Sequence, residues 1–219
     1  MTQRSLIGEY AKIEPLEDSS PSPTFWRAAA LRKAVDDAEA QESEIDRTAV
    51  AIARRLRSRG IVLTAGNGGS AAQAQHFAAE LVGRLSSGRE RGPLAARALA
   101  ADVATLTALA NDYGYAQVFS RQLRAVARPD DVLVLFSTSG RSENLLRAAE
   151  TARGLGVYTV ALLGAGPSPL AECDASFRTG ATDPGTVQEF HLLLVHALTE
   201  AIEEELASGT DIKPIRGER

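Results

Sequence analysis

Cysteine is nearly absent from this chain of 219 residues, which contains Cys173 and no second cysteine. A single cysteine cannot form a disulfide within the chain, so a small disulfide-stapled secreted domain is excluded and a reducing compartment is expected. The sequence also lacks any apolar run near the ~18 residues that a membrane helix requires. Its first 23 residues include acidic side chains where a signal peptide would be apolar. We therefore expect a cytoplasmic protein that does not enter a membrane.

An excess of basic charge is missing as well. The net charge is -4 at pH 7, and a chain of this balance lacks the electrostatic footprint of a nucleic-acid binder. One basic run, RRLRSR at 54–59, precedes Gly60. We interpret it as the last turn of a helix, where cations face the negative end of the helix dipole. A basic patch on the surface would have the same sequence, and that alternative stays open.

The remaining composition is that of a globular domain. Apolar residues make up 44% and charged residues 24% of the chain, which is close to the average for proteins with one hydrophobic core. We divide the chain into an N-terminal arm at 1–23, a single domain at 24–207 and a polar C-terminal tail at 208–219.

The apolar pattern predicts an α/β fold. Residues 24–59 have the spacing of one or two amphipathic helices, and β-rich runs then alternate with helical segments. The expected strands are 61–65, 97–100, 132–136, 157–163 and 175–178. The expected helices are 70–85, 103–110 continuing after a glycine break to 126, 142–155 and 186–206. This alternation predicts a doubly wound parallel sheet with helices on both faces.

A glycine-rich turn, GNGGS at 66–70, follows the first expected strand. Ligands of open parallel sheets bind beyond the carboxyl ends of the strands, and glycines let the backbone approach them closely. Ser70 has the chemistry to cap the next helix. The turn lacks the G-x-G-x-x-G spacing of a dinucleotide site. A tight turn with a helix cap is an equally good interpretation of these letters.

A second turn, STSGRS at 137–142, follows the strand expected at 132–136. It places four hydroxyl groups at the entry to a helix, which suits a phosphate monoester. There is no Gly-Lys-Ser/Thr sequence, so the turn is not a nucleotide P-loop. Serine-rich turns that only cap themselves are common, and that alternative stays open.

The chain has three histidines, and all lie on expected helices. His76 and Glu80 are four residues apart and so share a helix face, as do Gln188 and His196. His191 points about 140° away from His196, taking ~100° per residue. His76, Glu80, Gln188 and His196 could together bind a divalent metal such as zinc. Alternatively, His76 and Glu80 form a surface pair, and the two histidines of the last helix lie in the interior.

Four segments, in the same order, closely resemble the phosphoheptose isomerases, a family of sugar isomerase (SIS) domains. They are GNGGSAAQAQHFAAELVGR (66–84), LTALANDYGYAQVFSRQ (106–122), STSGRS (137–142) and QEFHLLLVH (188–196). The resemblance extends over residues 34–206. It implies a flavodoxin-like SIS domain preceded by N-terminal helices, which agrees with the fold expected from the apolar pattern.

The resemblance also implies a function. Members of this family are cytoplasmic homotetramers that convert sedoheptulose 7-phosphate to D-glycero-D-manno-heptose 7-phosphate, with one zinc ion per subunit at a site shared between subunits. The residues that match the family's metal-site positions are His76, Glu80, Gln188 and His196. Glu80 and His196 also match its acid/base pair. The residues that match substrate-binding positions are Asn67, Gly68, Gly69, Glu80, Asn111, Asp112, Ser137, Thr138, Ser139, Ser142 and Gln188.

Two residues depart from the family pattern. Arg141 stands where asparagine is usual, and Ala65 stands where cysteine or a similar small residue is common. A cation at 141 would strengthen phosphate binding or favour a different substrate. One alternative function is therefore an isomerase of a related ketose phosphate in the biosynthesis of a glycosylated metabolite. Another is a non-catalytic tetrameric binding module, like the relatives that associate with a replication initiator, although such a module has no need for both Glu80 and His196.

Overall fold

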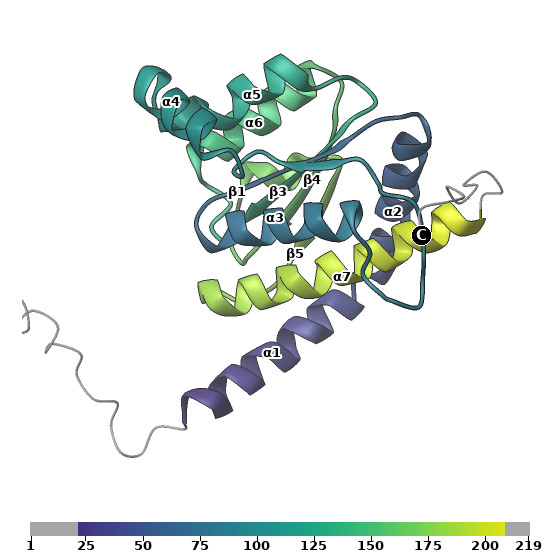
Figure 1. Ribbon diagram of the computed structural model, residues 1–219. Helices are drawn as coiled ribbons and strands as arrows, with labels where there is room; N and C mark the ends of the chain where they lie inside the picture. The colour runs from purple at the N-terminus through teal and green to yellow at the C-terminus, as the bar shows by residue number, and fades with distance from the viewer. Residues whose placement is uncertain (1–21, 209–219) are drawn as a thin grey trace, which may run out of the picture.

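The computed structural model describes residues 22–208, which form a five-stranded, wholly parallel sheet of order β2-β1-β3-β4-β5 (Figure 1). The strands are β1 Val62–Gly66, β2 Ala96–Ala98, β3 Val132–Ser137, β4 Tyr158–Leu163 and β5 Ala175–Arg178. The predicted α/β fold is therefore confirmed. The arm and the tail expected from the sequence lie outside the described residues, except for their innermost positions.

Helices cover both faces of the sheet (Figure 1). The helices packed on one face are α1 Pro23–Glu39, α2 Glu42–Arg57, α3 Gly69–Val82 and α7 Pro184–Ser208. Those on the other side are α4 Val103–Tyr113, α5 Val118–Val126 and α6 Glu143–Gly154, with the short 3₁₀ helices η2 Tyr115–Gln117 and η3 Pro169–Glu172. No helix within 22–208 is long and apolar enough to cross a membrane.

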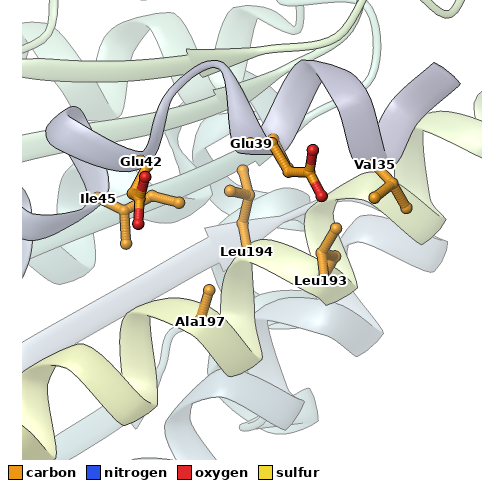
Figure 2. Close-up of a pocket in the computed structure, with 8 residues that line it drawn as sticks. Val35, Glu39, Glu42, Ile45, Leu193, Leu194 and Ala197 are labelled. Carbon is orange, nitrogen blue, oxygen red and sulfur yellow. The ribbon is translucent and has the colours of Figure 1, made fainter. Parts of the chain in front are cut away.

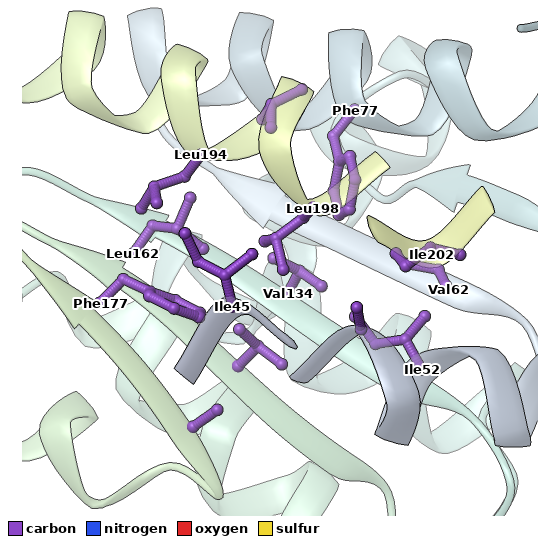
Figure 3. Close-up of a cluster of buried hydrophobic side chains, with 14 of the residues drawn as sticks. Ile45, Ile52, Val62, Phe77, Val134, Leu162, Phe177, Leu194, Leu198 and Ile202 are labelled. Carbon is purple, nitrogen blue, oxygen red and sulfur yellow. The ribbon is translucent and has the colours of Figure 1, made fainter. Parts of the chain in front are cut away.

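The three central strands, β1, β3 and β4, are largely apolar on both sides because both faces of the sheet are covered. Along β3, Val132, Val134 and Phe136 face α3 and α7, while Leu133 and Leu135 face α5 and α6. The buried side chains on the α3 and α7 side form one hydrophobic cluster, which Figure 3 shows. In this cluster Phe77 of α3 and Leu198 of α7 contact the sheet. Each fully buried side chain of this size stabilises the fold by about 1.5–3 kcal/mol. These contacts fix the two helices that carry the histidines against the sheet.

The N-terminal segment and the glycine break follow the sequence expectations. Residues 24–59 form two helices, and the basic run supplies the last turn of α2 through Arg54, Arg55 and Arg57. The long helical segment after 103 is interrupted at Gly114, whose φ of 80° lies in the left-handed region. Glycine reaches this conformation without the steric cost that a side chain would impose.

The expected cap at Ser70 is wrong. Helix α3 begins one residue earlier, at Gly69, and Gly68 occupies the N-cap position with a φ of 55°. Ser70 is instead buried within the first turn. A positive φ at the cap favours glycine over serine, so the backbone requirement decides the boundary.

A buried ion pair joins the end of α3 to α7. The Arg91 guanidinium lies 2.7 Å from a carboxylate oxygen of Glu203, and the two side chains are 12% and 5% exposed. Arg91 also donates to the carbonyl oxygens of Glu80 and Leu81, each at 2.8 Å, at the open carboxyl end of α3. The same side chain thus satisfies helix-end acceptors and holds Glu203.

We expect the Arg91→Met variant to lose about 3–5 kcal/mol of unfolding free energy, because Glu203 would be left as an unpaired buried carboxylate. Denaturant unfolding followed by circular dichroism measures the change. Arg89→Met is the matched control, since the Arg89–Glu204 pair is more than half exposed on both sides and such pairs contribute about 1 kcal/mol or less. Equal losses in the two variants would contradict the role assigned to Arg91.

Candidate active site

Two turns leave the sheet side by side at the carboxyl ends of adjacent strands. In the β1–β3 pair, Gly66 is opposite Phe136, so the turn after Gly66 and the turn after Ser137 start at neighbouring positions. This is the edge at which parallel sheets bind ligands. The structure thus places the glycine turn and the hydroxyl turn together.

The glycine turn is packed too closely for side chains. A Cβ at Gly66 would lie 2.5 Å from the Ser70 carbonyl oxygen. A Cβ at Gly69 would lie 2.5 Å from the side-chain amide of Gln188 on α7. The glycines therefore serve contacts within the chain, and the second contact brings Gln188 to the amino end of α3.

The hydroxyl turn holds its own shape. The amide of Gly140 donates to the Ser137 hydroxyl at 3.0 Å, and the amide of Arg141 donates to the Ser139 hydroxyl at 3.3 Å. Ser168 supports the turn from η3 by donating to the Gly140 carbonyl at 2.7 Å. Thr138 is half-buried between Ser137 and Ser139.

Ser142 is the N-cap residue of α6, but within residues 22–208 its hydroxyl makes no capping bond to that helix. The amino end of α6 therefore faces the turn with unpaired amides and the positive end of its dipole. This arrangement suits an anion with several acceptor oxygens.

His76, Glu80 and His196 meet between α3 and α7. The Nε2 atoms of His76 and His196 are 3.2 Å apart, and His76 Nε2 is 3.5 Å from a carboxylate oxygen of Glu80. The two imidazole rings are arranged edge to face, with centroids 5.4 Å apart. His76 is 39% exposed and Glu80 19% exposed at the side chain, so both are open to solvent.

The donor atoms are suited to a zinc ion. Two ligands at about 2.0–2.1 Å from a tetrahedral ion are ~3.4 Å apart, close to both distances at His76. Glu80 and His196 form no direct ion pair in the described chain, and no three His, Cys, Asp or Glu side chains of this part converge as a complete ion site. The pairs His76–Glu80 and His76–His196 thus have the spacing of neighbouring ligands in a tetrahedral site, and His76 belongs to both pairs.

His191 faces the other way, into the core. It is fully buried and lies against Phe136 and Phe190, with ring centroids 6.0 Å away in each case. Its two ring nitrogens have no partner of hydrogen-bond geometry among the described residues. Burial lowers the pKa of His191 to about 4, and the neighbouring Leu163 backbone carbonyl opposes part of this effect. One histidine of α7 is therefore interior and the other belongs to the His76 cluster.

Asn67 is joined to two residues that the sequence analysis did not single out. Its side-chain amide exchanges hydrogen bonds with the amide of Asn144, at 2.9 and 2.8 Å, and accepts a third from the Tyr115 hydroxyl at 2.8 Å. Asn144 lies in the first turn of α6, and Tyr115 begins η2. Tyr115 falls inside a family-like segment, whereas nothing in the sequence pattern marks Asn144.

Asn111 and Asp112 are exposed at the carboxyl end of α4, where Asn111 donates to the Asp112 carboxylate at 2.8 Å. Among the residues that the structure describes, α4 buries none of its own side chains. Tyr115 is the link between this segment and the glycine turn.

A cavity of about 500 Å³ lies away from the strand ends, between α7 and the junction of α1 with α2 (Figure 2). Its lining includes Val35, Ile45, Leu193 and Leu194, with Glu39 and Glu42 at its edge. The mostly apolar lining has neither the hydroxyl turn nor a histidine, so we do not assign the catalytic site to it.

The chain is similar to known sugar isomerases. A family model described as the SIS domain matches residues 26–164. A phosphoheptose isomerase of Rhodospirillum rubrum is 49% identical over 154 residues, covering 70% of this chain and 81% of the relative. One of Thiobacillus denitrificans is 41% identical, covering 81% and 91%. The structure of a phosphoheptose isomerase from Francisella tularensis superposes with a TM-score of 0.75 at 34% identity, covering 93% of this chain and all of that one.

The burial of His191 makes stability depend on pH. In the unfolded chain this histidine gains a proton near pH 6.5, whereas in the folded protein its pKa is about 4. The His191 contribution is therefore fully present above pH 6.5, and unfolding free energy falls by roughly 3 kcal/mol as the pH drops from 6.5 to 4. In His191→Leu, this part of the pH dependence should disappear.

Denaturant unfolding of both proteins at a series of pH values measures the difference. If the two curves ran parallel between pH 6.5 and 4, His191 would not be the buried neutral group.

Proposed function

Since this chain belongs to the phosphoheptose isomerase family of SIS-domain proteins, we propose that it isomerises its sugar phosphate with Glu80 and His196 as the proton-transfer pair. The activity is that of a sedoheptulose 7-phosphate isomerase, which forms D-glycero-D-manno-heptose 7-phosphate. The observation that supports the pair is the contact of His76 with both residues, at 3.5 and 3.2 Å.

Ketose-to-aldose conversion requires a base that removes a proton beside the carbonyl and an acid that returns one to the neighbouring atom. Glu80 offers a carboxylate and His196 an imidazole, from two different helices. Because His76 touches both, substrate carbons that lie beside it are within reach of either group. Glu80 removes the proton and His196 supplies one in this scheme.

The phosphate group of the substrate binds at the hydroxyl turn. Ser137, Thr138, Ser139 and Ser142 surround the amino end of α6, and the free cap position of Ser142 supports the assignment. Binding energy from this remote group orients the reacting carbons toward α3 and α7. Asn67, Gly68 and Gly69 contact the sugar between the two ends, and Asn111 and Asp112 contact it from α4.

Zinc is the proposed cofactor, one ion per subunit, held by His76, Glu80, Gln188 and His196. The support is the pair of ligand-like distances at His76. A divalent cation there would polarise the oxygens of the carbonyl and the neighbouring hydroxyl. The Gln188 side chain lies against Gly69, about two turns of α3 before His76, so it would have to turn toward His76 to join the ion. A carboxylate that binds a cation is a weaker base, so Glu80 must divide its two roles.

We further propose a cytoplasmic homotetramer whose site is shared between subunits. Phe25 of α1 is 64% exposed, and Trp26 and Leu31 of the same helix are also exposed. The apolar cavity beside α1 and helix α4, whose side chains are at most partly buried, add to the surface that other copies would cover. A single free cysteine, Cys173, fits a reducing compartment.

A related ketose phosphate is the second candidate substrate, favoured by Arg141. This residue is exposed beside the hydroxyl turn and adds a cation where the family usually has asparagine. Incubation of the protein with sedoheptulose 7-phosphate and with shorter ketose phosphates, followed by NMR detection of the aldose, separates the two candidates.

In the same NMR assay, Glu80→Gln should lower turnover by ~100-fold or more, the scale for losing a positioned general base. The side chain keeps its size, so folding and substrate binding should persist. Glu150→Gln, an exposed glutamate on α6, is the control and should turn over normally. A Glu80→Gln enzyme with wild-type turnover would remove Glu80 from the reaction.

The zinc proposal is tested on α7. His196→Ala should lose bound zinc, measured by atomic absorption per subunit after dialysis, and should lose isomerisation with it. His191→Leu is the control on the same helix and should retain both, because His191 is buried in the core. Full zinc content in His196→Ala would contradict the ligand set.

A further inference from the structure

Three side chains from distant parts of the sequence form one polar network at the strand ends. Asn67 follows β1, Asn144 begins α6, and Tyr115 follows α4. The two asparagines exchange amide hydrogen bonds at 2.9 and 2.8 Å, and the Tyr115 hydroxyl donates to the side-chain amide oxygen (Oδ1) of Asn67 at 2.8 Å. The glycine turn, the helix of the hydroxyl turn and the end of α4 are thereby connected through one side chain.

The Asn67 amide is almost fully occupied by this network. Its oxygen, which can accept two hydrogen bonds, receives one from Asn144 and one from Tyr115. Its nitrogen donates one of two hydrogens to Asn144. Among the described residues, the second N–H of the Asn67 side chain has no partner and remains available to a substrate. The side chain therefore offers a substrate little by itself, and most of its bonding capacity serves to fix the turn.

Asn144 is the rigid member. It is 2% exposed, and a buried amide is costly unless its polar atoms are paired. It does not cap α6, because Ser142 occupies the cap position. The bonds it forms are directed at Asn67, across 77 residues of sequence. Any shift of the amino end of α6 is therefore transmitted to the glycine turn.

We propose that Asn144 and Tyr115 are positioning residues that, through Asn67, couple the phosphate-binding turn to the glycine turn. This rests on the proposed function and extends it. Phosphate held at the amino end of α6 then fixes Asn67, and the turn continues directly into Gly69 and α3, which carries His76 and Glu80. Tyr115 adds the segment that ends with Asn111 and Asp112.

The two residues should act to different extents. Tyr115 is 53% exposed, so water competes for its hydroxyl and the bond is the weaker link. Asn144 is enclosed and makes both amide bonds. The chemistry and the phosphate lie at opposite ends of the coupled unit, so loss of coupling should lower kcat more than it raises KM.

Kinetics with sedoheptulose 7-phosphate test the proposal. Tyr115→Phe, which removes one hydroxyl, should lower kcat about 5-fold, the effect of one lost hydrogen bond, with KM within 2-fold of wild type. Tyr113→Phe is the matched control, because the Tyr113 ring stacks on the Arg121 guanidinium and removal of its hydroxyl leaves that contact in place. Unchanged kcat in Tyr115→Phe, or an equal loss in Tyr113→Phe, would overturn the role of Tyr115.

Asn144→Ala should lower kcat by ~10-fold or more, and Asn144→Asp, which keeps the acceptor for Asn67, should recover part of the loss. A parallel fall in melting temperature with no split between kcat and KM would indicate a structural role alone and overturn the proposal. Tyr115→Phe changes an exposed residue and provides the test if Asn144→Ala does not fold.

Hydrogen exchange with inorganic phosphate tests the coupling without the isomerase reaction. In the wild-type protein, phosphate should slow amide exchange both at 137–142 and at 67–70. In Asn144→Ala the protection should be confined to 137–142, and in Ser139→Ala it should be weakened in both segments. Equal protection of 67–70 in wild type and Asn144→Ala, or none in wild type, would overturn the proposal. A wild-type protein that is coupled but inactive on every ketose phosphate would overturn only the proposed function.

Discussion

The register of β1 against β3 is the constraint on which the site depends. Because Gly66 stands opposite Phe136, the two turns that follow start from the same edge of the sheet. Side chains alternate between faces along a strand, so a slip of one residue would turn Phe136 from the α3 side to the α6 side. Because β3 is buried on both faces, such a slip would force the side chains on both faces to repack. The positions of the two turns are thus set mainly by the packing of apolar side chains along the strands.

The site also depends on the close approach of α3 and α7. Gly69 has no side chain and lets Gln188 lie against the amino end of α3, while Arg91 joins the other end of α3 to Glu203 on α7. The helices are held at both ends, and His76 and His196 meet between these contacts. Two helices fixed in this way can hold the proposed proton-transfer groups at distances that neither helix could set alone.

Local sequence rules predicted much of this structure, because strands and helices follow from short-range apolar periodicity. The alternation of runs gave all five described strands to within two residues at each end, and helix geometry separated His191 from His196. Ser70 was misassigned because the left-handed backbone at Gly68 decides where α3 begins. The hydrogen-bond partners of Asn67 could not be predicted from the sequence, for a different reason. Asn144 and Tyr115 meet it only after three segments fold together, and no local pattern encodes such a meeting.

The start of α3 also affects how an anion reaches the site. Its first turn reads Gly69, Ser70, Ala71, Ala72, and the side chain that covers this end is the neutral amide of Gln188. The positive end of the helix dipole is therefore not cancelled by a local carboxylate. A protein with a net charge of -4 thus keeps an attractive field at its strand ends. At physiological ionic strength this field extends about one Debye length, ~8 Å. A doubly charged sugar phosphate that binds there as proposed would be attracted over the last few ångströms of its approach, against the net negative charge of the protein.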